Sequence, residues 1–361
     1  MQTMTGYERT LNMLKRQPID RIPVYEHFWG DTHKVWAEKG YIPAETSFAD
    51  FFSFDMDEIW AFNFVADLNF KPQIIEETDE TILTRDGNGA LLRRHKLHDT
   101  TPEHVDFNVK DRNGWEEYIK PLLKAEDARI NYEGYRNKWK DCKEKERFFY
   151  VSCAHVFECI HPVCGHEHML AGMALDPEWV LDMSNTYGDL IAGMMEMLFA
   201  KEGLPDGVWF YEDMGFLGRP FMSPQMYKEL IQPAHKKTIA LAHSLGLPVV
   251  MHSCGMVEKL LPGMIEAGID CLQVIEVKAG MDLIKLHKLY GDRLSFMGGI
   301  DIREVYPNDL ARIDRELESK IPIVKEGYGF TLHSDHSIPA TVDMPVYRYF
   351  IDKGLELGSY K

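Results

Sequence analysis

The sequence has few cysteines, no long hydrophobic run and no excess of positive charge, and each absence excludes a class of protein. Its six cysteines are spread unevenly over 361 residues, which excludes the disulfide framework of small secreted proteins. The longest apolar runs, such as residues 247–251, have the length of a strand, whereas a membrane-spanning helix needs roughly 20 apolar residues. The first residues contain no apolar signal-peptide core. We therefore expect a cytoplasmic protein that has reduced thiols and no membrane contact.

The net charge and the absence of nucleotide-binding motifs exclude further classes of protein. A formal net charge of −17 works against binding to nucleic acid or to an anionic membrane. No Gly-x-Gly-x-x-Gly follows the first expected strand and no P-loop is present, which argues against a nucleotide-binding sheet. With 45% hydrophobic and 27% charged residues, the composition is that of a globular protein with a sizeable core.

The second half of the chain alternates between expected strands and expected helices. The strands are expected at residues 207–211, 247–251, 271–275, 294–297 and 329–332. Ser223 is the expected N-cap of one connecting helix, and Gly268 closes another. Single helices between strands indicate parallel pairing, and the first half adds strands at 21–25, 58–62 and 148–151.

These signals predict an α/β protein with a single (β/α)8 TIM barrel. We expect one domain over residues 1–361, with an N-terminal extension over about residues 1–20. An open doubly wound sheet is the alternative.

Each expected strand of the second half is followed at once by residues that can bind a metal or carry a proton. They are Glu212 and Asp213, His252 and Cys254, Glu276, Asp301, and the group His333, Asp335 and His336. In a β/α barrel the loops after the strand C-termini form the active site. We predict that Glu212 and Asp213 orient the substrate or donate a proton, and that Asp301, His333 and Asp335 bind it.

The pair His252 and Cys254 predicts a zinc ion. Side chains at positions i and i+2 of a strand end point to the same face, so an imidazole and a thiolate can converge there. Glu276 ends the adjacent strand and would add an oxygen ligand, while the loop 333–336 would close the site from the far side. Nitrogen, sulfur and oxygen donors together suit zinc better than magnesium or calcium. A hydrogen-bonded core histidine beside a buried thiol is the alternative.

A second cluster, over residues 153–168, contains four histidines and three cysteines. Its spacings match no zinc-finger pattern, and we interpret the segment as a loop followed by the start of a helix. His155 comes soon after the strand expected at 148–151, so we place it in the wall of the substrate pocket.

Several segments resemble the uroporphyrinogen decarboxylase superfamily. They are the run 15–24, Asp67-Leu68 with Pro72-Gln73, the run 175–178, and the segment from Glu212 to Pro339. The resemblance covers nearly the whole chain and implies a (β/α)8 barrel. The superfamily contains decarboxylases, and also methyltransferases that exchange methyl groups with corrinoid proteins.

The resemblance to the decarboxylases is incomplete where they bind their substrate. They carry an Arg-Gln-Ala-Gly-Arg segment after the Pro-Val stretch, whereas the equivalent run 25–31 here has no arginine and two acids. A porphyrinogen with eight carboxylates would find no cation there. Asp67 resembles the essential aspartate of the decarboxylases, which implies a substrate-binding role. We keep decarboxylation only as an alternative.

The corrinoid-dependent methyltransferase branch fits better, with its methylcobalamin:coenzyme M methyltransferases and O-demethylases. It binds zinc through a His-x-Cys pair. In the cobalamin-independent methionine synthases, whose barrel is similar, a glutamate follows that cysteine by 22 residues, as Glu276 follows Cys254 here. The late cysteine ligand of these relatives is replaced by Asp335-His336. The resemblance implies His252, Cys254 and Glu276 as ligands, with His336 fourth and Asp335 or His333 as alternatives.

We therefore expect a zinc methyltransferase that moves a methyl group from a small methylated compound to the cob(I)alamin of a separate corrinoid protein. A methoxylated aromatic is the expected donor, and zinc would polarise its leaving oxygen. Transfer from a methylcorrinoid to a thiol or to tetrahydrofolate is an alternative. A non-catalytic corrinoid carrier is another, although the Asp-x-His-x-x-Gly loop of such carriers is absent. A second copy of the chain, in a homodimer, is the other partner considered.

Overall fold

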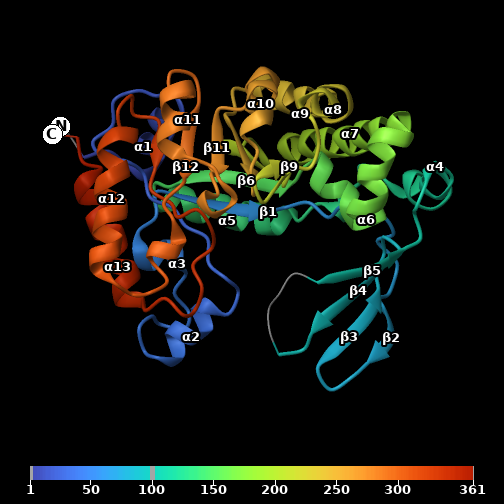
Figure 1. Ribbon diagram of the computed structural model, residues 1–361, viewed down its shortest axis with the longest axis horizontal. Helices are drawn as coiled ribbons and strands as arrows, with labels where there is room; N and C mark the ends of the chain where they lie inside the picture. The colour runs from blue at the N-terminus through green and yellow to red at the C-terminus, as the bar shows by residue number, and fades with distance from the viewer. Residues whose placement is uncertain (1–2, 98–101, 361) are drawn as a thin grey trace.

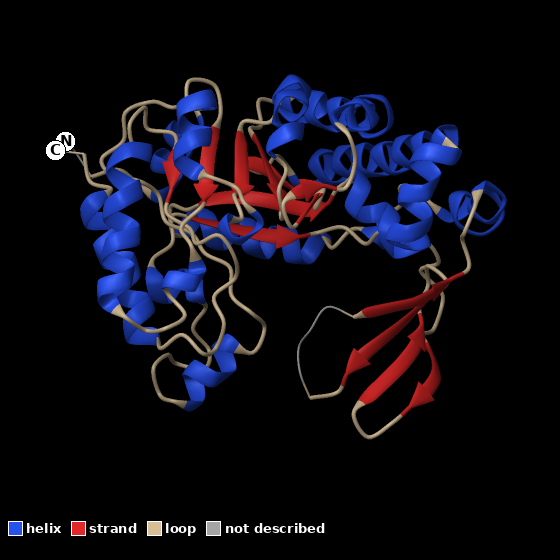
Figure 2. Cartoon of the chain, viewed as in Figure 1, coloured by secondary structure: helices blue, strands red, loops and turns tan. Residues whose placement is uncertain are grey.

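A curled parallel sheet forms the centre of the computed structural model, which describes residues 3–97 and 102–360 (Figure 2). Its seven strands stand in the order β1-β6-β7-β10-β11-β12-β13, and every neighbouring pair is parallel. The strands are β1 (Met56–Trp60), β6 (Phe148–Ala154), β7 (Gly207–Tyr211), β10 (Val249–Ser253), β11 (Cys271–Val274), β12 (Ser295–Gly298) and β13 (Phe330–Thr331). The predicted α/β class is confirmed.

The segment 21–25, where a strand was predicted, lies between the two edge strands of this sheet. The amide of Leu332, directly after β13, donates to Pro23 O (2.9 Å), and the amide of Asp55, directly before β1, donates to Val24 O (3.1 Å). The segment forms a single parallel bridge, between Val24 and Leu332, and no continuous strand. Proline has no N–H to donate to a ladder, which explains why the pairing stays short.

Helices cover the outer face of the curled sheet (Figure 1). The α-helices of the described residues are α1 (Gly6–Leu14), α2 (Thr32–Glu38), α3 (Phe48–Phe52), α4 (Arg112–Gly114), α5 (Tyr132–Glu144), α6 (Val156–Leu175), α7 (Pro177–Glu202), α8 (Pro224–Met226), α9 (Gln232–Ser244), α10 (Leu261–Ala267), α11 (Leu283–Tyr290), α12 (Leu310–Val324) and α13 (Met344–Leu357), of which α2 and α4 lie away from the sheet. Ser223 caps α8 and Gly268, with φ +106°, ends α10, as predicted. Across residues 3–97 and 102–360, no helix is both long and apolar enough to cross a membrane.

The core lies inside the curled sheet and between the sheet and its helices. β6, β10 and β11 are almost wholly buried, because strands that are covered on both faces carry apolar residues at successive positions. This is why runs such as residues 148–151 could be recognised as strands. The long apolar helices α6 and α7 pack on each other and complete one side of the core.

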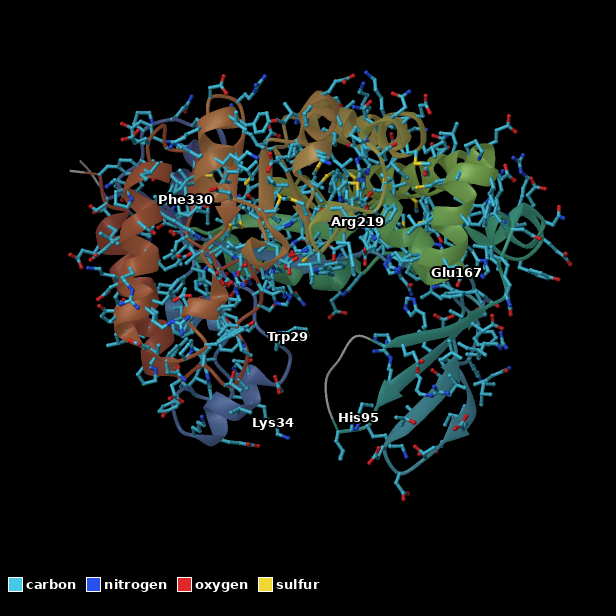
Figure 3. The ribbon with its side chains drawn as sticks, in the orientation of Figure 1. Trp29, Lys34, His95, Glu167, Arg219 and Phe330 are labelled. Carbon is cyan, nitrogen blue, oxygen red and sulfur yellow. The ribbon has the colours of Figure 1, made fainter. Side chains whose placement is uncertain are left out.

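A four-stranded antiparallel sheet that the sequence did not predict is inserted between β1 and β6. Its strands are β2 (Gln73–Glu77), β3 (Thr81–Arg85), β4 (Ala90–His95) and β5 (Glu103–Phe107), in that order. β2 is exposed along its whole length, so its residues give no buried-strand pattern. The sheet projects from the body on the same side as α2 (Figure 1), and His95 lies across from Trp29 and Lys34 (Figure 3). The inserted sheet follows the C-terminal end of β1, and α2 follows the segment 21–25 that runs parallel beside it, so both flank the end of the sheet where the site was predicted.

Candidate metal site and substrate pocket

Two of the proposed zinc ligands, His252 and Cys254, come together at the C-terminal end of β10. The Nε2 atom of His252 lies 3.3 Å from Cys254 Sγ. Asp213, from the loop after β7, joins them: its Oδ1 lies 3.1 Å from His252 Nε2 and accepts from the Cys254 amide at 2.8 Å. The three residues offer a nitrogen, a sulfur and an oxygen atom within 4.8 Å of one another. This is a donor set that zinc prefers in proteins.

The ring of His252 is oriented by Gln273 on the neighbouring strand. The two residues are register partners of β10 and β11, and His252 Nδ1 is hydrogen-bonded to Gln273 Oε1. An amide oxygen can only accept, so Nδ1 donates and Nε2 is the ring atom that faces Cys254 and Asp213. Metal-binding histidines are commonly held through their other ring nitrogen in this way.

The electrostatics of this group favour a positive charge between its members. Burial lowers the pKa of His252, but Cys254 and Asp213 more than offset this and hold it well above its usual range. Burial raises the pKa of the Cys254 thiol, although the neighbouring His252 lowers it in part. A metal ion replaces the proton of a thiol when it binds. The group therefore fits a divalent cation both in its donor atoms and in its charge.

Two glycines bring the Asp213 loop against the Cys254 loop. A Cβ atom at Gly215 would lie 2.5 Å from Cys254 O, and one at Gly255 would lie 2.2 Å from the carbonyl carbon of Gly215. Gly255 also has φ +78°, a conformation that favours glycine. Larger residues would push the loops apart and with them Asp213 and Cys254.

The other two proposed ligands lie beside the group of Asp213, His252 and Cys254. Glu276 accepts from the amide that follows Cys254 at 2.6 Å, and its other oxygen lies 3.0 Å from Lys278 Nζ. Among the described residues, Glu276 is not part of the group whose ligand atoms all lie within 4.8 Å of one another.

His336 lines the same pocket as His252 and Cys254. Its ring stacks on Trp29, with 5.7 Å between ring centroids. Its Nδ1 is buried and has no hydrogen-bond partner among the described residues. His336 therefore has a buried ring nitrogen that is free for a ligand.

A pocket of about 290 Å³ opens next to His252 and Cys254. Its lining consists of His27, Phe28, Glu58, Trp60, Tyr211, His252, Cys254, Gln273, Val274, His333, His336 and Ser337. Trp60 is 48% exposed and packs on Tyr211, with 4.6 Å between ring centroids. The lining contains four histidines but neither lysine nor arginine, so the pocket has aromatic walls and no permanent cation.

A partly buried carboxylate, Glu58, forms one wall of this pocket. It accepts from the Tyr211 hydroxyl at 2.9 Å, from Ser152 Oγ, and lies 3.2 Å from His27 Nε2. Burial alone would raise the pKa of Glu58, but His27 and the two hydroxyls bring it below its usual value. Burial and the neighbouring Glu58 raise the pKa of Tyr211 far above its usual range. Glu58 is therefore ionised at neutral pH, and Tyr211 keeps its proton.

His333 connects Glu58 to the group of Asp213, His252 and Cys254. Its Nε2 lies 3.1 Å from His27 Nδ1 and 3.2 Å from Gln273 Nε2. Burial, and then the nearby His27, lower the pKa of His333 well below its usual value, so its ring is neutral. Hydrogen bonds thus run from Glu58 through two histidines to Gln273 and on to His252.

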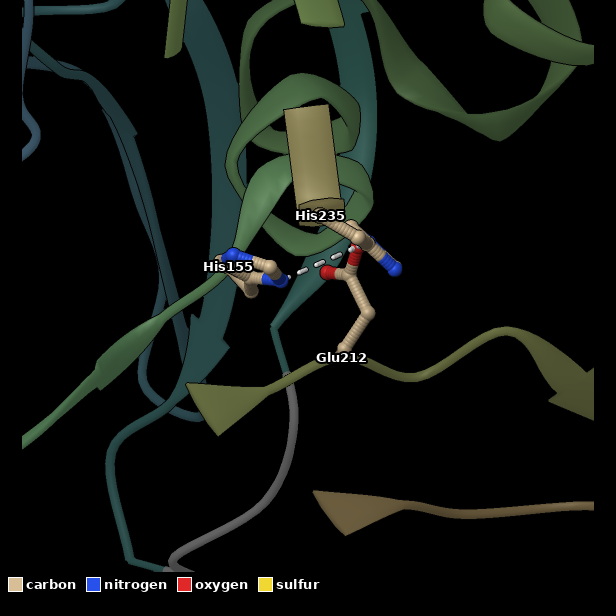
Figure 4. A group of neighbouring side chains, drawn as sticks. All are labelled: His155, Glu212 and His235. Carbon is tan, nitrogen blue, oxygen red and sulfur yellow. Dashed lines mark hydrogen bonds and ion pairs between the residues drawn. The ribbon is translucent and has the colours of Figure 1, made fainter. Parts of the chain in front are cut away.

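Glu212 and His155 lie on the helix side of the sheet, outside the pocket lining. Glu212 accepts from the amides of Phe157 (2.9 Å) and Glu158 (3.0 Å) at the start of α6, and lies 2.6 Å from His235 Nε2. His155 Nδ1 is 3.9 Å from Glu212, and all three titratable side chains are fully buried (Figure 4). Successive side chains of a strand point to opposite faces. Because Tyr211 points into the pocket, Glu212 points toward α6.

Three proposed substrate-binding aspartates also lie away from the lining. Asp67 accepts from the amide of Asn69 at 2.9 Å, in the loop that leads to the inserted sheet. Asp301 is paired with Arg303 at 2.7 Å. Asp335 is buried and accepts from two backbone amides of the loops after β11 and β12, at 2.8 and 2.7 Å. Of the residues proposed to bind substrate, His333 alone is in the lining.

Several residues that line the pocket were not predicted as site residues, because the prediction considered only the residues that follow strands. They are His27, Glu58, Trp60, Tyr211 and Gln273. Glu58 and Gln273 lie inside strands, at positions that would otherwise be apolar. A polar residue within a buried strand is costly unless it has partners, and this is the signal that could have found both.

The chain belongs to the uroporphyrinogen decarboxylase family, since the family model described as "Uroporphyrinogen decarboxylase (URO-D)" matches residues 165–354, more than half of it. The methylated-thiol–coenzyme M methyltransferase of Methanosarcina mazei is 31% identical over 87 residues. That alignment covers 24% of this chain and spans 22% of the length of the curated relative. A solved methyltransferase structure from Methanosarcina mazei matches 98% of this chain and 99% of its own, with a TM-score of 0.67 and 16% identity. This structural similarity shows that the two proteins share a fold.

Proposed function

We propose that this protein is a corrinoid-dependent methyltransferase. It moves a methyl group from a small methylated compound, with a methoxylated aromatic as the first candidate, to the corrinoid of a separate protein. The observation that carries the proposal is the pocket in which His252 and Cys254 face aromatic walls and the partly buried carboxylate of Glu58. Two similar proteins are named methyltransferases, which supports the same reaction class.

The size and charge of the pocket argue against a porphyrinogen. Its volume of about 290 Å³ is just below the roughly 300–1,000 Å³ that is usual for ligand sites. A porphyrinogen has four rings and eight carboxylates, and the lining offers no lysine or arginine to bind them. A compound of about one aromatic ring suits the pocket better.

His252 and Cys254 are the proposed zinc ligands. Asp213 is the nearest carboxylate, and Glu276 and His336 remain candidates for the rest of the set. When bound, zinc supplies a Lewis acid for the leaving atom, and the reduced corrinoid of the partner supplies the methyl acceptor.

The side chains of the pocket bind the substrate and manage its charge. Trp60 and Phe28 give an apolar wall that reduces the access of water. When the bond between oxygen and the methyl carbon breaks, the oxygen keeps the electron pair and needs a hydrogen-bond donor. The Tyr211 hydroxyl keeps its proton and is held by Glu58 and His27, so it is the proposed donor.

The architecture proposed for this function is a single (β/α)8 barrel over the whole chain. The segment 21–25 would stand as the eighth strand, since it is hydrogen-bonded to both edges of the sheet. The inserted sheet β2–β5 would then be a long excursion after the strand β1. We also propose that the protein works in the cytoplasm.

A second candidate is methyl transfer between a methylcorrinoid and a thiol. The similarity to a methylated-thiol–coenzyme M methyltransferase over 87 residues favours it. Both candidates use the same pocket and the same metal, so only the substrate distinguishes them.

The test is to incubate the zinc-loaded protein with a reduced corrinoid protein and a panel of donors. Methylation of the corrinoid is followed by its absorbance. Methylation by methoxylated aromatics supports the first candidate, and methylation by methylated thiols alone supports the second. Failure with every donor, or carboxylate loss from a porphyrinogen, would refute the proposal.

A further inference from the structure

A second pocket lies beside the hairpin of β8 (Gly215–Phe216) and β9 (Arg219–Pro220). Its volume is about 610 Å³, within the usual range for small-molecule sites. The residues that line it are Leu170, Phe216, Arg219, Pro220, Phe221, Met222, Ser223, Pro224, Met226 and Lys259. None of them lines the pocket beside Cys254, so the two pockets are distinct.

The charged residues of this second pocket are both cations. Arg219 (Figure 3) and Lys259 have no ion pair among the described residues, and the lining contains no acid. The adjacent acid, Glu258, is already paired with Lys285. In a chain with a net charge of −17, two unpaired cations in one pocket make a local site for an anion.

The remaining lining is apolar except for Ser223, whose hydroxyl caps α8. Met222 is buried and Phe221 partly buried, whereas Phe216 is 55% exposed at the rim. An exposed aromatic ring beside unpaired cations suits a ligand that has an apolar body and a charged end. We infer that this pocket binds a small amphipathic anion, an aromatic or acyl group that bears a carboxylate or a phosphate.

The pocket adjoins the loops of the proposed metal site, although its inferred ligand goes beyond the proposed reaction. The Met256 amide donates to Phe216 O at 3.0 Å, and the Gly218 amide donates to Ala279 O at 2.9 Å. These bonds fasten the hairpin to the loops that carry Cys254 and Glu276. The ligand would bind next to these loops without entering the substrate pocket.

Ligand-observed fluorine NMR tests the inference with three probes of similar shape. They are 4-fluorobenzoate, 4-fluorophenyl phosphate and the neutral 4-fluorobenzyl alcohol. Arg219→Gln and Lys259→Gln should each raise the Kd of the anions by about fivefold, which corresponds to about 1 kcal/mol for an exposed charge. The neutral probe should bind weakly to every variant. Whichever anion binds more tightly identifies a carboxylate or a phosphate as the charged end.

Matched control variants remove an exposed cation elsewhere. Arg293→Gln and Lys140→Gln lie outside the pocket and should leave the Kd unchanged. Zinc content should be the same in all four variants, which separates this test from that of the proposed function. Equal binding of the neutral probe, anion binding that Arg219→Gln and Lys259→Gln leave unchanged, or equal losses in the controls would overturn the inference.

Discussion

Replacing Gln273 with leucine tests whether His252 is held as a metal ligand. Leucine has a similar size but no oxygen to accept the hydrogen bond from His252 Nδ1. The ring then loses the contact that points Nε2 toward Cys254 and Asp213. The substitution also removes the contact between Gln273 and His333, but it leaves every proposed metal ligand in place.

The structure sets the expected size of the effect. Loss of the partner that orients a metal-binding histidine typically costs 10- to 100-fold in metal affinity, or about 1.4–2.8 kcal/mol. Gln273 is fully buried, so bulk water cannot easily replace its oxygen. We therefore expect Gln273→Leu to weaken zinc binding by about 100-fold.

The assay is a competition between the protein and a chromophoric chelator for zinc. Gln273→Glu keeps an acceptor for Nδ1 and should stay within about threefold of the original affinity. Gln232→Leu is the matched control, because Gln232 is also buried, donates to the carbonyl of Gly263 and lies outside the pocket lining. Circular dichroism and thermal unfolding check that each variant is folded.

Two results would refute the reasoning. A folded Gln273→Leu protein that binds zinc as tightly as the original would show that this hydrogen bond does not orient a ligand. An equal loss in Gln232→Leu would show that the effect comes from general destabilisation and not from His252.

The other predictions concern the thiol, a buried acid and a buried guanidinium. Cys254→Ser should lose stoichiometric zinc in elemental analysis while Cys164→Ala keeps it, and full zinc in Cys254→Ser would contradict the ligand assignment. Burial raises the pKa of Glu26 to about 8, so between about pH 4.5 and 8 the folded protein holds a proton that the unfolded chain has lost. The free energy of unfolding should then fall as pH rises through this window, and Glu26→Gln should flatten the fall in urea titrations at pH 5 and 8; an unchanged slope would count against it. Arg129 donates to five backbone carbonyls at the base of the inserted segment. Arg129→Met should lower the free energy of unfolding by about 3 kcal/mol or more, and a urea titration that shows a loss below about 1 kcal/mol would contradict this.

The strands and helices of the second half could be predicted because their signals are local. Buried parallel strands are short apolar runs, and residues such as Ser223 and Gly268 mark helix ends within one turn. The predicted family is likewise confirmed. The first half was harder to predict, because the exposed strand β2 and its neighbours bury too little to show a pattern.

The proposed metal site follows from local strand geometry only in part. His252 and Cys254 stand two apart at one strand end, so their proximity follows from strand geometry alone. The acid beside them does not follow in this way. Glu276, the predicted oxygen ligand, is bonded to an amide of the Cys254 loop and to Lys278 and stays a candidate, whereas Asp213 offers an oxygen atom within 4.8 Å of the ligand atoms of His252 and Cys254.

The sequence by itself determined the class of fold, the family and the pair of residues at the centre of the site, since each depends on neighbours within a few positions or on motifs. Tertiary structure alone decided which acid lies beside His252 and Cys254. Asp213 reaches Cys254 because two glycines bring distant loops into contact. Glu212, one residue earlier, points the opposite way and ties β7 to α6. The direction of a side chain after a strand depends on the course of its loop, and that course is set by packing between segments far apart in the chain.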